Sequence, residues 1–343
     1  METHAVLLSG EHRTLPAAEL RALLGVHAPG AQVRFDAGLA FVAGAPDGQI
    51  RAALSRMALA HAWGAFWGEA TDTQEGLATL ETEVRRRADG KGTLAVVSER
   101  MGFTKSANSL LVERRLGAAA AAAGHRIDLK APERTLFAWL LDGRILVGEQ
   151  FGRPDRSRFE SRISDRRAHF SPVALHPRRA AGLLHLARVA PGGRIYDPFC
   201  GTGTFVLESS LAGYDAWGSD LDAWMVQGTL QTLTDVPAEP LLGNVFVADV
   251  ADTPAMMGQV AGIVTDLPYG RASTGHGEEV AALYRRAFAA FAELLPAGAH
   301  AVVGHSDPAL VAPIEEYGFR IVERHEEKAH RSLTRHFVVA QRL

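Results

Sequence analysis

The 343-residue sequence has little of what disulfide-bonded, membrane and metal-binding proteins need. Its one cysteine, Cys200, excludes an internal disulfide and a zinc site built from several cysteines. The 14 histidines show no HxxxH or comparable spacing, so we expect no bound metal. No stretch approaches the roughly 20 apolar residues of a membrane span, and the N-terminus lacks the basic start of an export signal. We therefore expect a cytoplasmic protein that does not enter a membrane.

Charge is unevenly distributed along a chain whose formal net charge is only -3. Residues 1–170 carry 23 basic and 20 acidic side chains, whereas residues 171–343 carry 13 and 19. Residues 84–170 hold most of the basic excess, with 18 basic against 10 acidic side chains. Such asymmetry is expected when one module holds nucleic-acid phosphate and another a small cofactor, although a solvated charged surface explains the charge equally well.

Hydrophobic patterning predicts an N-terminal half made of three regions. Residues 1–70 form an α+β segment with strands at 4–10 and 62–70 and helices at 15–26 and 50–61. Residues 71–152 form a second α+β unit, with helices at 73–88 and 106–124 and a strand turn at Asp142-Gly143. Residues 153–170 contain six arginines and no clean period, which predicts a basic linker.

Residues 171–343 alternate strands with helices until the last two strands, which follow each other directly. The predicted strands cover residues 194–199, 215–220, 244–250, 262–268, 299–307, 319–326 and 335–341. Several are short apolar runs that end in an acid, as in parallel strands buried on both faces with ligands at their carboxyl ends. This pattern predicts an α/β fold, and its seven strands with a terminal hairpin resemble the Rossmann-like sheet of class I methyltransferases.

The strongest local signal is the sequence DPFCGTGT at 197–204. A strand ends at Asp197, a loop containing Gly201, Thr202 and Gly203 turns, and a helix begins near Thr204. The glycines let a ligand approach the backbone, and the helix N-terminus offers free N–H groups. The third glycine of the dinucleotide fingerprint is absent, which argues against NAD. The leading acid instead favours a nucleoside with a charged amino-acid tail.

Two further acids follow at the ends of the next two predicted strands. Asp220 comes about 20 residues after the glycine loop, where a carboxylate can accept both hydroxyls of a ribose. Asp249 ends the following predicted strand and could accept a hydrogen bond from an adenine amino group. Either acid alone is more typical of a strand-end cap, but three acids on three successive strands favour a ligand site.

The second strong signal is the sequence TDLPYG at 265–270, where the fourth predicted strand ends. An amino group on an aromatic ring is a poor nucleophile, so it must be held in place beside an acceptor for its proton. The Asp266 carboxylate and the Leu267 carbonyl, fixed by Pro268, supply two such acceptors. Tyr269 offers a face for a base turned out of its stack. A plain strand-to-loop turn becomes improbable once the glycine loop is considered together with this motif.

Both motifs together resemble the amino-group methyltransferases that carry an Asp-Pro-Pro-Tyr motif. Within this group, nearly the whole chain is similar to the tRNA guanosine-10 N2-methyltransferases of archaea and eukaryotes. Residues 5–24 resemble the N-terminal segment of that family, residues 91–150 a THUMP RNA-binding module, and residues 164–187 the stretch before the first catalytic strand. Leu267 departs from the proline of many relatives, although the proposed chemistry uses only its carbonyl.

The resemblance implies a set of ligands and residue roles. It implies S-adenosyl-L-methionine as cofactor, bound by Asp197, Gly201, Thr202, Gly203, Asp220 and Asp249. It implies direct methylation of N2 of a flipped-out guanine in tRNA, at guanosine 10, by Asp266, Leu267, Pro268 and Tyr269. It also implies that residues 84–170 hold the tRNA, with candidate phosphate contacts at Lys91, Lys105, Arg114 and Arg115, and it allows a small zinc-containing activator protein as a further partner.

Three alternatives remain open at this point. The target could be a guanine N2 at another tRNA position or in ribosomal RNA. A DNA adenine-N6 enzyme shares the Asp-Pro-Pro-Tyr chemistry, but residues 91–150 disfavour it. A non-catalytic RNA-binding scaffold belongs to a different class, and the intact acceptor set from Asp266 to Tyr269 argues against it.

Overall fold

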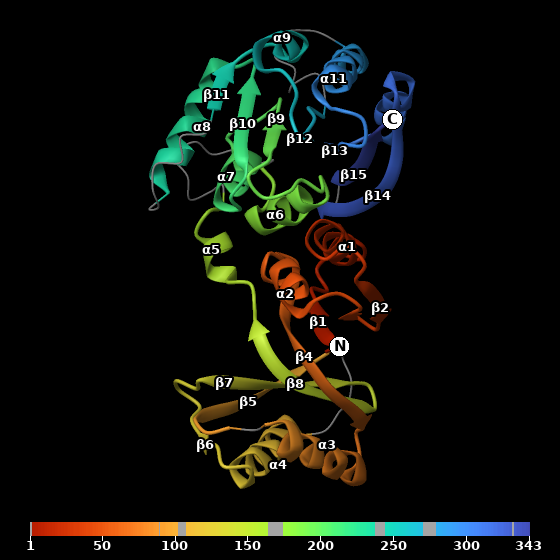
Figure 1. The fold of residues 1–343 in the computed structure, drawn as a ribbon. Coiled ribbons are helices and arrows are strands. Elements are labelled where there is room, and N and C mark those ends of the chain that lie inside the picture. Colours follow the sequence, from red (N-terminus) through yellow and green to blue (C-terminus); the bar gives the residue numbers. More distant parts are fainter. Residues whose placement is uncertain are drawn as a thin grey trace. The chain divides into compact units, whose positions relative to one another are not determined.

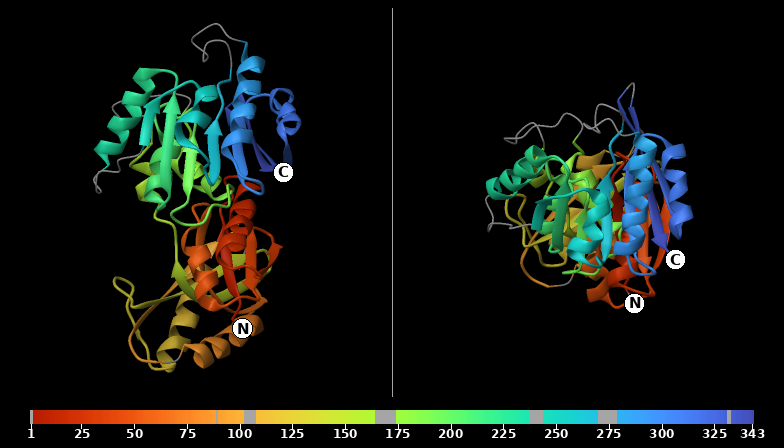
Figure 2. Two further views of the ribbon diagram at one scale, coloured as in Figure 1. Left: turned by 45° about the horizontal axis from the view of Figure 1, so that its top comes forward. Right: turned by 90° about the horizontal axis from the view of Figure 1, so that it is seen from above.

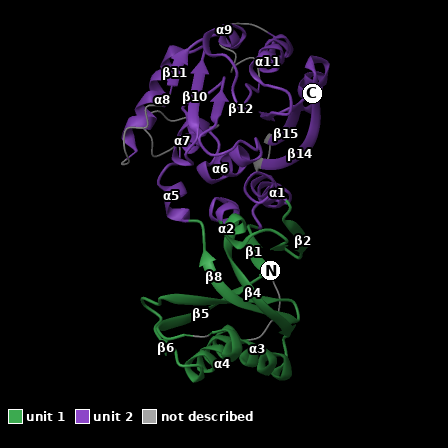
Figure 3. Cartoon of the chain, in the orientation of Figure 1, with its two compact units in different colours: residues 1–9, 30–51, 60–154 green, residues 10–29, 52–59, 155–343 purple. Residues whose placement is uncertain are grey.

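Contacts within the chain define two compact units (Figure 3). A computed structural model describes residues 2–88, 90–101, 108–163, 174–236, 244–269, 279–330 and 333–343. Unit 1 comprises residues 1–9, 30–51 and 60–154, and unit 2 comprises residues 10–29, 52–59 and 155–343. Two pieces of the N-terminal segment thus belong to the C-terminal unit, a grouping that differs from the four consecutive regions predicted above. None of the described helices is long and apolar enough to cross a membrane.

Unit 1 is built on an eight-stranded sheet in the order β2-β3-β1-β4-β8-β7-β5-β6. Its strands are β1 (His4–Leu8), β2 (Gln32–Asp36), β3 (Leu39–Ala43), β4 (Ala60–Thr71), β5 (Thr93–Arg100), β6 (Arg126–Ile127), β7 (Arg134–Leu141) and β8 (Arg144–Gly152). The predicted turn at Asp142-Gly143 joins β7 to β8, and Gly143 has the positive φ of 72° that such a turn favours. One sheet therefore includes strands from both predicted N-terminal regions.

Helices α3 (Gln74–Arg87) and α4 (Ser109–Ala122) lie side by side along the sheet of unit 1 (Figure 1). They bury an apolar cluster that includes Leu80, Val84 and Leu116 against β5, β7 and β8. Thr73 caps α3 by accepting a hydrogen bond from the Gly76 N–H at 3.1 Å, and arginines end the helix as the helix dipole favours. The arginines at the end of α3 and those on α4 thus belong to a folded α/β unit.

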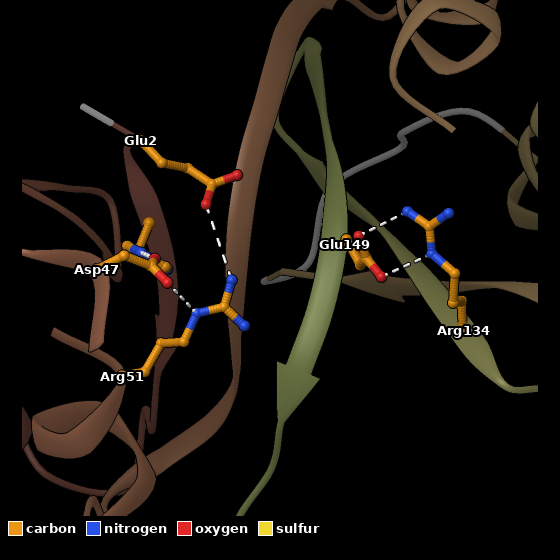
Figure 4. A network of polar contacts seen from close by, with 6 residues as sticks. Glu2, Asp47, Arg51, Arg134 and Glu149 are labelled. Carbon is orange, nitrogen blue, oxygen red and sulfur yellow. Dashed lines mark hydrogen bonds and ion pairs between the residues drawn. The ribbon is translucent and has the colours of Figure 1, made fainter. Parts of the chain in front are cut away.

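A polar network joins the N-terminus of unit 1 to helix α2 (Asp47–Ser55) and is drawn in Figure 4. Glu2, His4 and Asp47 place ligand atoms within 4.8 Å of one another, the one such group among the described residues. Arg51 already supplies a cation there, since its Nε lies 2.7 Å from Asp47 and its guanidinium carbon 3.5 Å from the Phe151 ring centroid. We therefore interpret this group as an ion-pair network rather than a metal site.

The described strands of unit 2 form a seven-stranded sheet in the order β11-β10-β9-β12-β13-β15-β14. They are β9 (Arg194–Asp197), β10 (Asp215–Asp220), β11 (Asn244–Val247), β12 (Gly262–Asp266), β13 (His300–His305), β14 (Phe319–His330) and β15 (Leu333–Arg342). Strands β9 to β13 run parallel to one another, and β15 pairs antiparallel with β13 and with β14. The predicted class I sheet with its terminal hairpin is confirmed.

Alternate residues of these strands pack into two different cores, as expected for a sheet covered on both faces. Tyr196, Ile263 and Val338 face the core that is covered by α11 (Val280–Leu294), which is coloured blue in Figure 2. Ile195, Val264 and Val339 face the opposite core, beneath α6 (Pro177–His185). The remaining helical segments of unit 2 are α5 (Arg156–Glu160), α7 (Thr204–Leu211), α8 (Ala223–Asp235), η2 (Val250–Asp252), α9 (Thr253–Met257), α12 (Pro308–Val311) and η3 (Ala312–Tyr317).

Two local predictions differ from the structure. The predicted helix at 50–61 is shifted, because α2 ends at Ser55 and residues 60–61 begin β4. The predicted linker at 153–170 contains the short helix α5, capped by Asp155, whose carboxylate accepts a hydrogen bond from Ser157 N–H at 3.0 Å. Residues 164–170 of that linker lie outside the described part of the chain.

Helix α1 (Leu15–His27) packs on α6 and is held there by a buried carboxylate. Glu19 has no exposed surface and accepts hydrogen bonds from Ala58 N (2.7 Å) and Leu59 N (2.8 Å). Its Oε1 also lies 2.8 Å from His185 Nδ1 on α6. A carboxylate buried with this many donors is stabilised by them, and each donor depends on it in turn.

We expect Glu19→Ala to lower the free energy of unfolding by about 3–5 kcal/mol, because it leaves three buried donors without an acceptor. Chemical denaturation measures this change, and Glu75→Ala on the exposed first turn of α3 is the matched control. A loss below about 1 kcal/mol in the Glu19 variant would show that α1 does not depend on this carboxylate.

Candidate active site

Strand β9 delivers Asp197 to the carboxyl edge of the unit 2 sheet, where the glycine loop begins. The carboxyl group is only 3% exposed, and its Oδ1 accepts hydrogen bonds from Phe199 N (3.1 Å) and the Thr265 hydroxyl (2.6 Å). Burial raises the pKa of Asp197 to about 7, and the nearby carboxylates of Asp220 and Asp266 add to that effect. Asp197, Asp220 and Asp266 therefore come from three strands to one edge of the sheet. The sequence analysis grouped Asp197 and Asp220 with Asp249 instead.

The two glycines of the loop have different structural roles. Both have left-handed backbones, with φ of 51° at Gly201 and 83° at Gly203. A Cβ at Gly203 would lie 2.6 Å from the Thr229 side chain, so this glycine is required for packing. A Cβ at Gly201 would meet no atom within 4 Å. The open side of Gly201 is the place where a ligand can approach the backbone, while Thr202 is buried beside it.

This difference predicts a contrast between two alanine variants. Gly203→Ala should destabilise the protein by about 1–3 kcal/mol, since strain and a close contact combine. Gly201→Ala should cost only about 1 kcal/mol of stability but weaken cofactor binding by at least about 10-fold. Thermal unfolding and calorimetric titration with S-adenosyl-L-methionine separate the two effects. Equal cofactor affinity in wild type and Gly201→Ala would contradict the assigned role of the open side.

Asp220 ends β10 as predicted and is bound to the glycine loop. Its Oδ2 accepts a hydrogen bond from Gly201 N at 2.9 Å, and its Oδ1 accepts one from Asp222 N at 3.0 Å. Burial raises its pKa above the ordinary value. Each oxygen keeps a second lone pair for a ligand hydroxyl, so the carboxylate can hold a ribose while fixing the loop.

The sequence analysis predicted that Asp249 ends a strand, and this was wrong. Asp249 lies two residues beyond β11, where it caps the short helix η2. The prediction failed because β11 stops at Val247 and the chain turns before the acid. Its Oδ1 accepts hydrogen bonds from Ala251 N (2.9 Å) and from the Arg286 guanidinium on α11 (2.7 Å). Burial opposes its ionisation, yet these donors hold its pKa below the ordinary value.

Strand β12 delivers Asp266 to the same edge, next to β9. Its side chain lies against Gly304 of β13, where a Cβ would be only 2.3 Å from Asp266 Oδ1. The Tyr269 hydroxyl donates a hydrogen bond to Oδ1, and the Arg335 Nε lies 3.9 Å from Oδ2. Burial raises the pKa of Asp266, an effect opposed by the Arg335 charge and the Tyr269 hydrogen bond.

The rest of the motif is fixed by its neighbours. Leu267 is buried, and its N–H donates to the Gly304 carbonyl at 2.9 Å. The Tyr284 hydroxyl, on α11, donates to the Pro268 carbonyl at 3.1 Å. Residues 270–278, which include the end of the motif, lie outside the described residues. The loop from Asp266 to Tyr269 is therefore held from both β13 and α11.

The arrangement suits S-adenosyl-L-methionine, a ligand that carries an ammonium, a sulfonium and two ribose hydroxyls. Buried carboxylates at Asp197 and Asp220 complement positive charge and accept hydroxyl hydrogen bonds. The open side of Gly201 provides close access to the backbone between them. Asp266 lies at the end of the adjacent strand β12, beside the glycine loop that follows β9.

Four basic residues were predicted to contact RNA, and their surroundings in the structure differ from one another. Lys91 lines a cavity of about 540 Å³ in unit 1, together with Gly90, Gly92, Thr93, Ala123, Gly124, Arg126 and Glu133. Arg114 is exposed on α4, whereas Arg115 on the same helix is half-buried and forms an ion pair with Glu81. Lys105 lies outside the described residues. Lys91 and Arg114 therefore remain the more accessible candidates.

Sequence reasoning did not identify three residues that contact the site. Arg286 binds Asp249, Tyr284 binds the Pro268 carbonyl, and Arg335 lies beside Asp266. The first two lie on α11 and the third on β15, far along the chain from the motifs. None is part of a short motif, so only the fold brings them to the site.

Comparisons with known proteins agree with this geometry. Residues 164–336 match the family described as UPF0020: RMKL-like, methyltransferase domain. The chain is 30% identical over 341 residues to the tRNA (guanine(10)-N2)-dimethyltransferase of Methanothermobacter thermautotrophicus strain Delta H, covering 98% of this chain and 99% of that protein.

Two solved structures share the fold over almost the full length. TrmN from Thermus thermophilus aligns with a TM-score of 0.58 at 24% identity, covering 99% of this chain and 100% of that chain. SMU.472, described as a putative methyltransferase complexed with SAH, aligns with a TM-score of 0.54 at 15% identity, covering 100% of this chain and 99% of that chain. From the 30% identity over almost the whole chain, together with the match to the methyltransferase domain, it follows that this chain belongs to the tRNA (guanine(10)-N2)-dimethyltransferase family.

Proposed function

We propose that the protein transfers a methyl group from S-adenosyl-L-methionine to N2 of guanosine 10 in tRNA. One observation carries this proposal most directly: the glycine loop after β9 and the Asp266–Tyr269 loop after β12 leave the sheet at adjacent strands. A donor bound at the first loop therefore lies beside acceptor groups of the second. Family membership supports tRNA as substrate and guanine N2 as target.

The chain's own residues perform three tasks in the proposed reaction. The cofactor, when bound, supplies an electrophilic methyl group. Asp197 is proposed to bind its charged amino-acid tail, and Asp220 its ribose. Asp249 is proposed to accept a hydrogen bond from its adenine through a lone pair that the hydrogen bond from Arg286 does not use. Tyr269 stacks on the flipped-out guanine and so fixes the plane of the base and the position of its amino group.

Asp266 and the Leu267 carbonyl accept hydrogen bonds from the two N–H groups of the guanine amine. The nitrogen gains positive charge as its bond to the methyl carbon forms, and the nearby carboxylate stabilises that charge. Asp266 then takes the surplus proton, because its pKa is raised by burial and the methylated amine is acidic at that moment. The bound cofactor would supply the methyl group in one displacement, in which its carbon–sulfur bond breaks as the carbon–nitrogen bond forms. Cys200 takes no part, since burial raises the pKa of its thiol.

Unit 1 is proposed to hold the tRNA through exposed basic side chains such as Lys91 and Arg114. The predicted RNA-binding segment at 71–152, with its THUMP-like part, supplies α3, α4 and strands β5 to β8 of this unit. The cytoplasm, where tRNA is found, is the proposed location. A small zinc-containing activator protein is proposed as a further partner whose effect is measured after the chain is assayed alone.

The test is transfer of tritiated methyl from S-adenosyl-L-methionine to an unmodified tRNA transcript, followed by digestion and nucleotide mapping. We expect the label as N2-methylguanosine or N2,N2-dimethylguanosine at position 10. Label at another guanine would support the alternative target. Saturable tRNA binding without cofactor binding or label would support the non-catalytic scaffold and overturn the proposal.

A further inference from the structure

A row of alternating charges leads from helix α6 to the methyl-transfer site within unit 2. Arg179 on α6 forms an ion pair with Glu327 on β14, and Glu327 pairs in register with Arg335 on β15. Arg335 in turn lies beside the Asp266 carboxylate. Glu327 and Arg335 are 9% and 5% exposed, so both charges are taken almost entirely out of water. Buried charges of this kind are retained when each has a partner.

The strand register explains why Arg335 reaches the carboxyl edge. His336 lies opposite His305, the last residue of β13, and β15 runs antiparallel to that strand. Arg335 therefore lies one residue beyond the end of β13, at the edge where Asp266 and the glycine loop emerge. Gly304 on β13 pairs in register with Asp266, and its missing side chain leaves room for the Asp266 carboxylate.

The geometry of the contact with Asp266 is unusual for an arginine–carboxylate pair. The shortest separation, from Arg335 Nε to Asp266 Oδ2, is 3.9 Å, which is longer than a hydrogen bond. The Arg335 guanidinium carbon also lies 5.8 Å from the centroid of the Tyr269 ring, within range of a cation–π interaction. Arg335 thus acts on the carboxylate through its charge and leaves the Oδ2 lone pairs to another donor.

We propose that Arg335 is a positioning residue for methyl transfer, which keeps Asp266 ionised and steadies Tyr269 without occupying the carboxylate oxygen that receives the guanine amino group. The inference rests on the proposed function, because it assigns Asp266 as the acceptor of that amine. Glu327 lies opposite Arg335 in the register of the hairpin, and Arg179 balances the charge of Glu327.

The charges around Asp266 determine the expected pH dependence. The groups that face it from neighbouring elements are Tyr269 on its own loop, Arg335 and Glu327 on the hairpin, Asp197 on β9 and Tyr284 on α11. Burial raises the pKa of Asp266, the Arg335 charge lowers it, and the Glu327 charge raises it. Removing Arg335 should therefore raise this pKa further, and removing the Glu327 charge should lower it.

The experiment measures single-turnover methyl transfer to the tRNA transcript between pH 5.5 and 9.5, so that the chemical step is observed. We expect Arg335→Met to reduce the rate by about 30-fold at pH 7 and to shift the acid limb upward by more than one pH unit. The loss should be largely recovered at pH 9.5. Arg335→Lys should restore a profile near that of wild type, and Arg320→Met, on the exposed part of β14, is the matched control.

A second variant keeps the inference testable if Arg335→Met does not fold. Glu327→Gln should shift the acid limb in the opposite direction, to lower pH, and an unchanged limb in that variant would overturn the inference. The inference also fails if Arg335→Met keeps the wild-type rate and profile, or if it loses cofactor binding together with activity at every pH. Wild type that makes no N2-methylguanosine would instead count against the proposed function itself.

Discussion

Asp266→Asn is expected to slow methyl transfer by about 10³-fold, which is the loss found when an enzyme loses one preorganised group that stabilises charge in the transition state. The amide has nearly the same shape, but its NH₂ group donates where the guanine amine needs an acceptor. It also cannot take the surplus proton or stabilise the positive charge on nitrogen. The fold should survive, because the hydrogen bond from Tyr269 can be kept by the amide oxygen.

Single-turnover rates with saturating tRNA and cofactor measure this effect. The affinity for S-adenosyl-L-methionine should change less than about 3-fold, since the proposed cofactor ligands are Asp197 and Asp220. Asp235→Asn, at the exposed end of α8, is the matched control and should retain the wild-type rate. A rate within 10-fold of wild type in Asp266→Asn would remove this residue from the mechanism.

Asp197→Asn is expected to separate stability from function. The two hydrogen bonds to this side chain both end on Oδ1, so an amide oxygen can keep them. The variant lacks the negative charge that we propose to pair with the cofactor's ammonium. Loss of one partner from a buried charge pair predicts an affinity for S-adenosyl-L-methionine at least about 100-fold weaker.

The same variant should be more stable than wild type at alkaline pH. Burial raises the pKa of Asp197 from 3.8 to about 7, so the folded protein keeps a proton that the unfolded chain releases. The wild-type free energy of unfolding therefore falls as pH rises from about 4 to 7 and is constant above, and the total loss is about 4 kcal/mol. Asparagine has no such dependence.

Chemical denaturation of both proteins at pH 5 and pH 8 tests this expectation. The advantage of Asp197→Asn should grow by about 2–3 kcal/mol between the two values. Because the ammonium group of the cofactor is proposed to replace a proton on Asp197, wild-type affinity should also weaken as pH falls below 7. A variant that binds the cofactor like wild type, or gains no stability at pH 8, would refute the assigned role of Asp197.

The sequence predicted the parts of the site that depend on local chemistry. The loop at 197–204 and the motif at 265–270 each combine a strand end, a turn and special residue types, and such patterns survive in any sheet of this kind. The alternation of short apolar strands with helices likewise predicted the seven-stranded sheet with its hairpin. Asp249 was misplaced by two residues because strand ends are set by pairing with β10 rather than by the acid itself.

Contacts between distant segments could not be predicted in this way. Arg335 appears in the sequence as one basic residue of a strand, and only the antiparallel register of β15 places it beside Asp266. Glu19 reads as an ordinary helix residue, yet the folded chain buries it against residues 58 and 59 and His185. A single sequence holds no signal for either pairing, because no local pattern records which helix or strand will be the neighbour.

N2 of guanosine 10 is the atom that we propose receives the methyl group. Inosine differs from guanosine only by the absence of that amino group, so a tRNA with inosine at position 10 is the most direct test. We expect labelled product from the guanosine-10 tRNA and none from the inosine-10 tRNA, with both binding equally well in competition. Equal labelling of the two tRNAs would contradict the account.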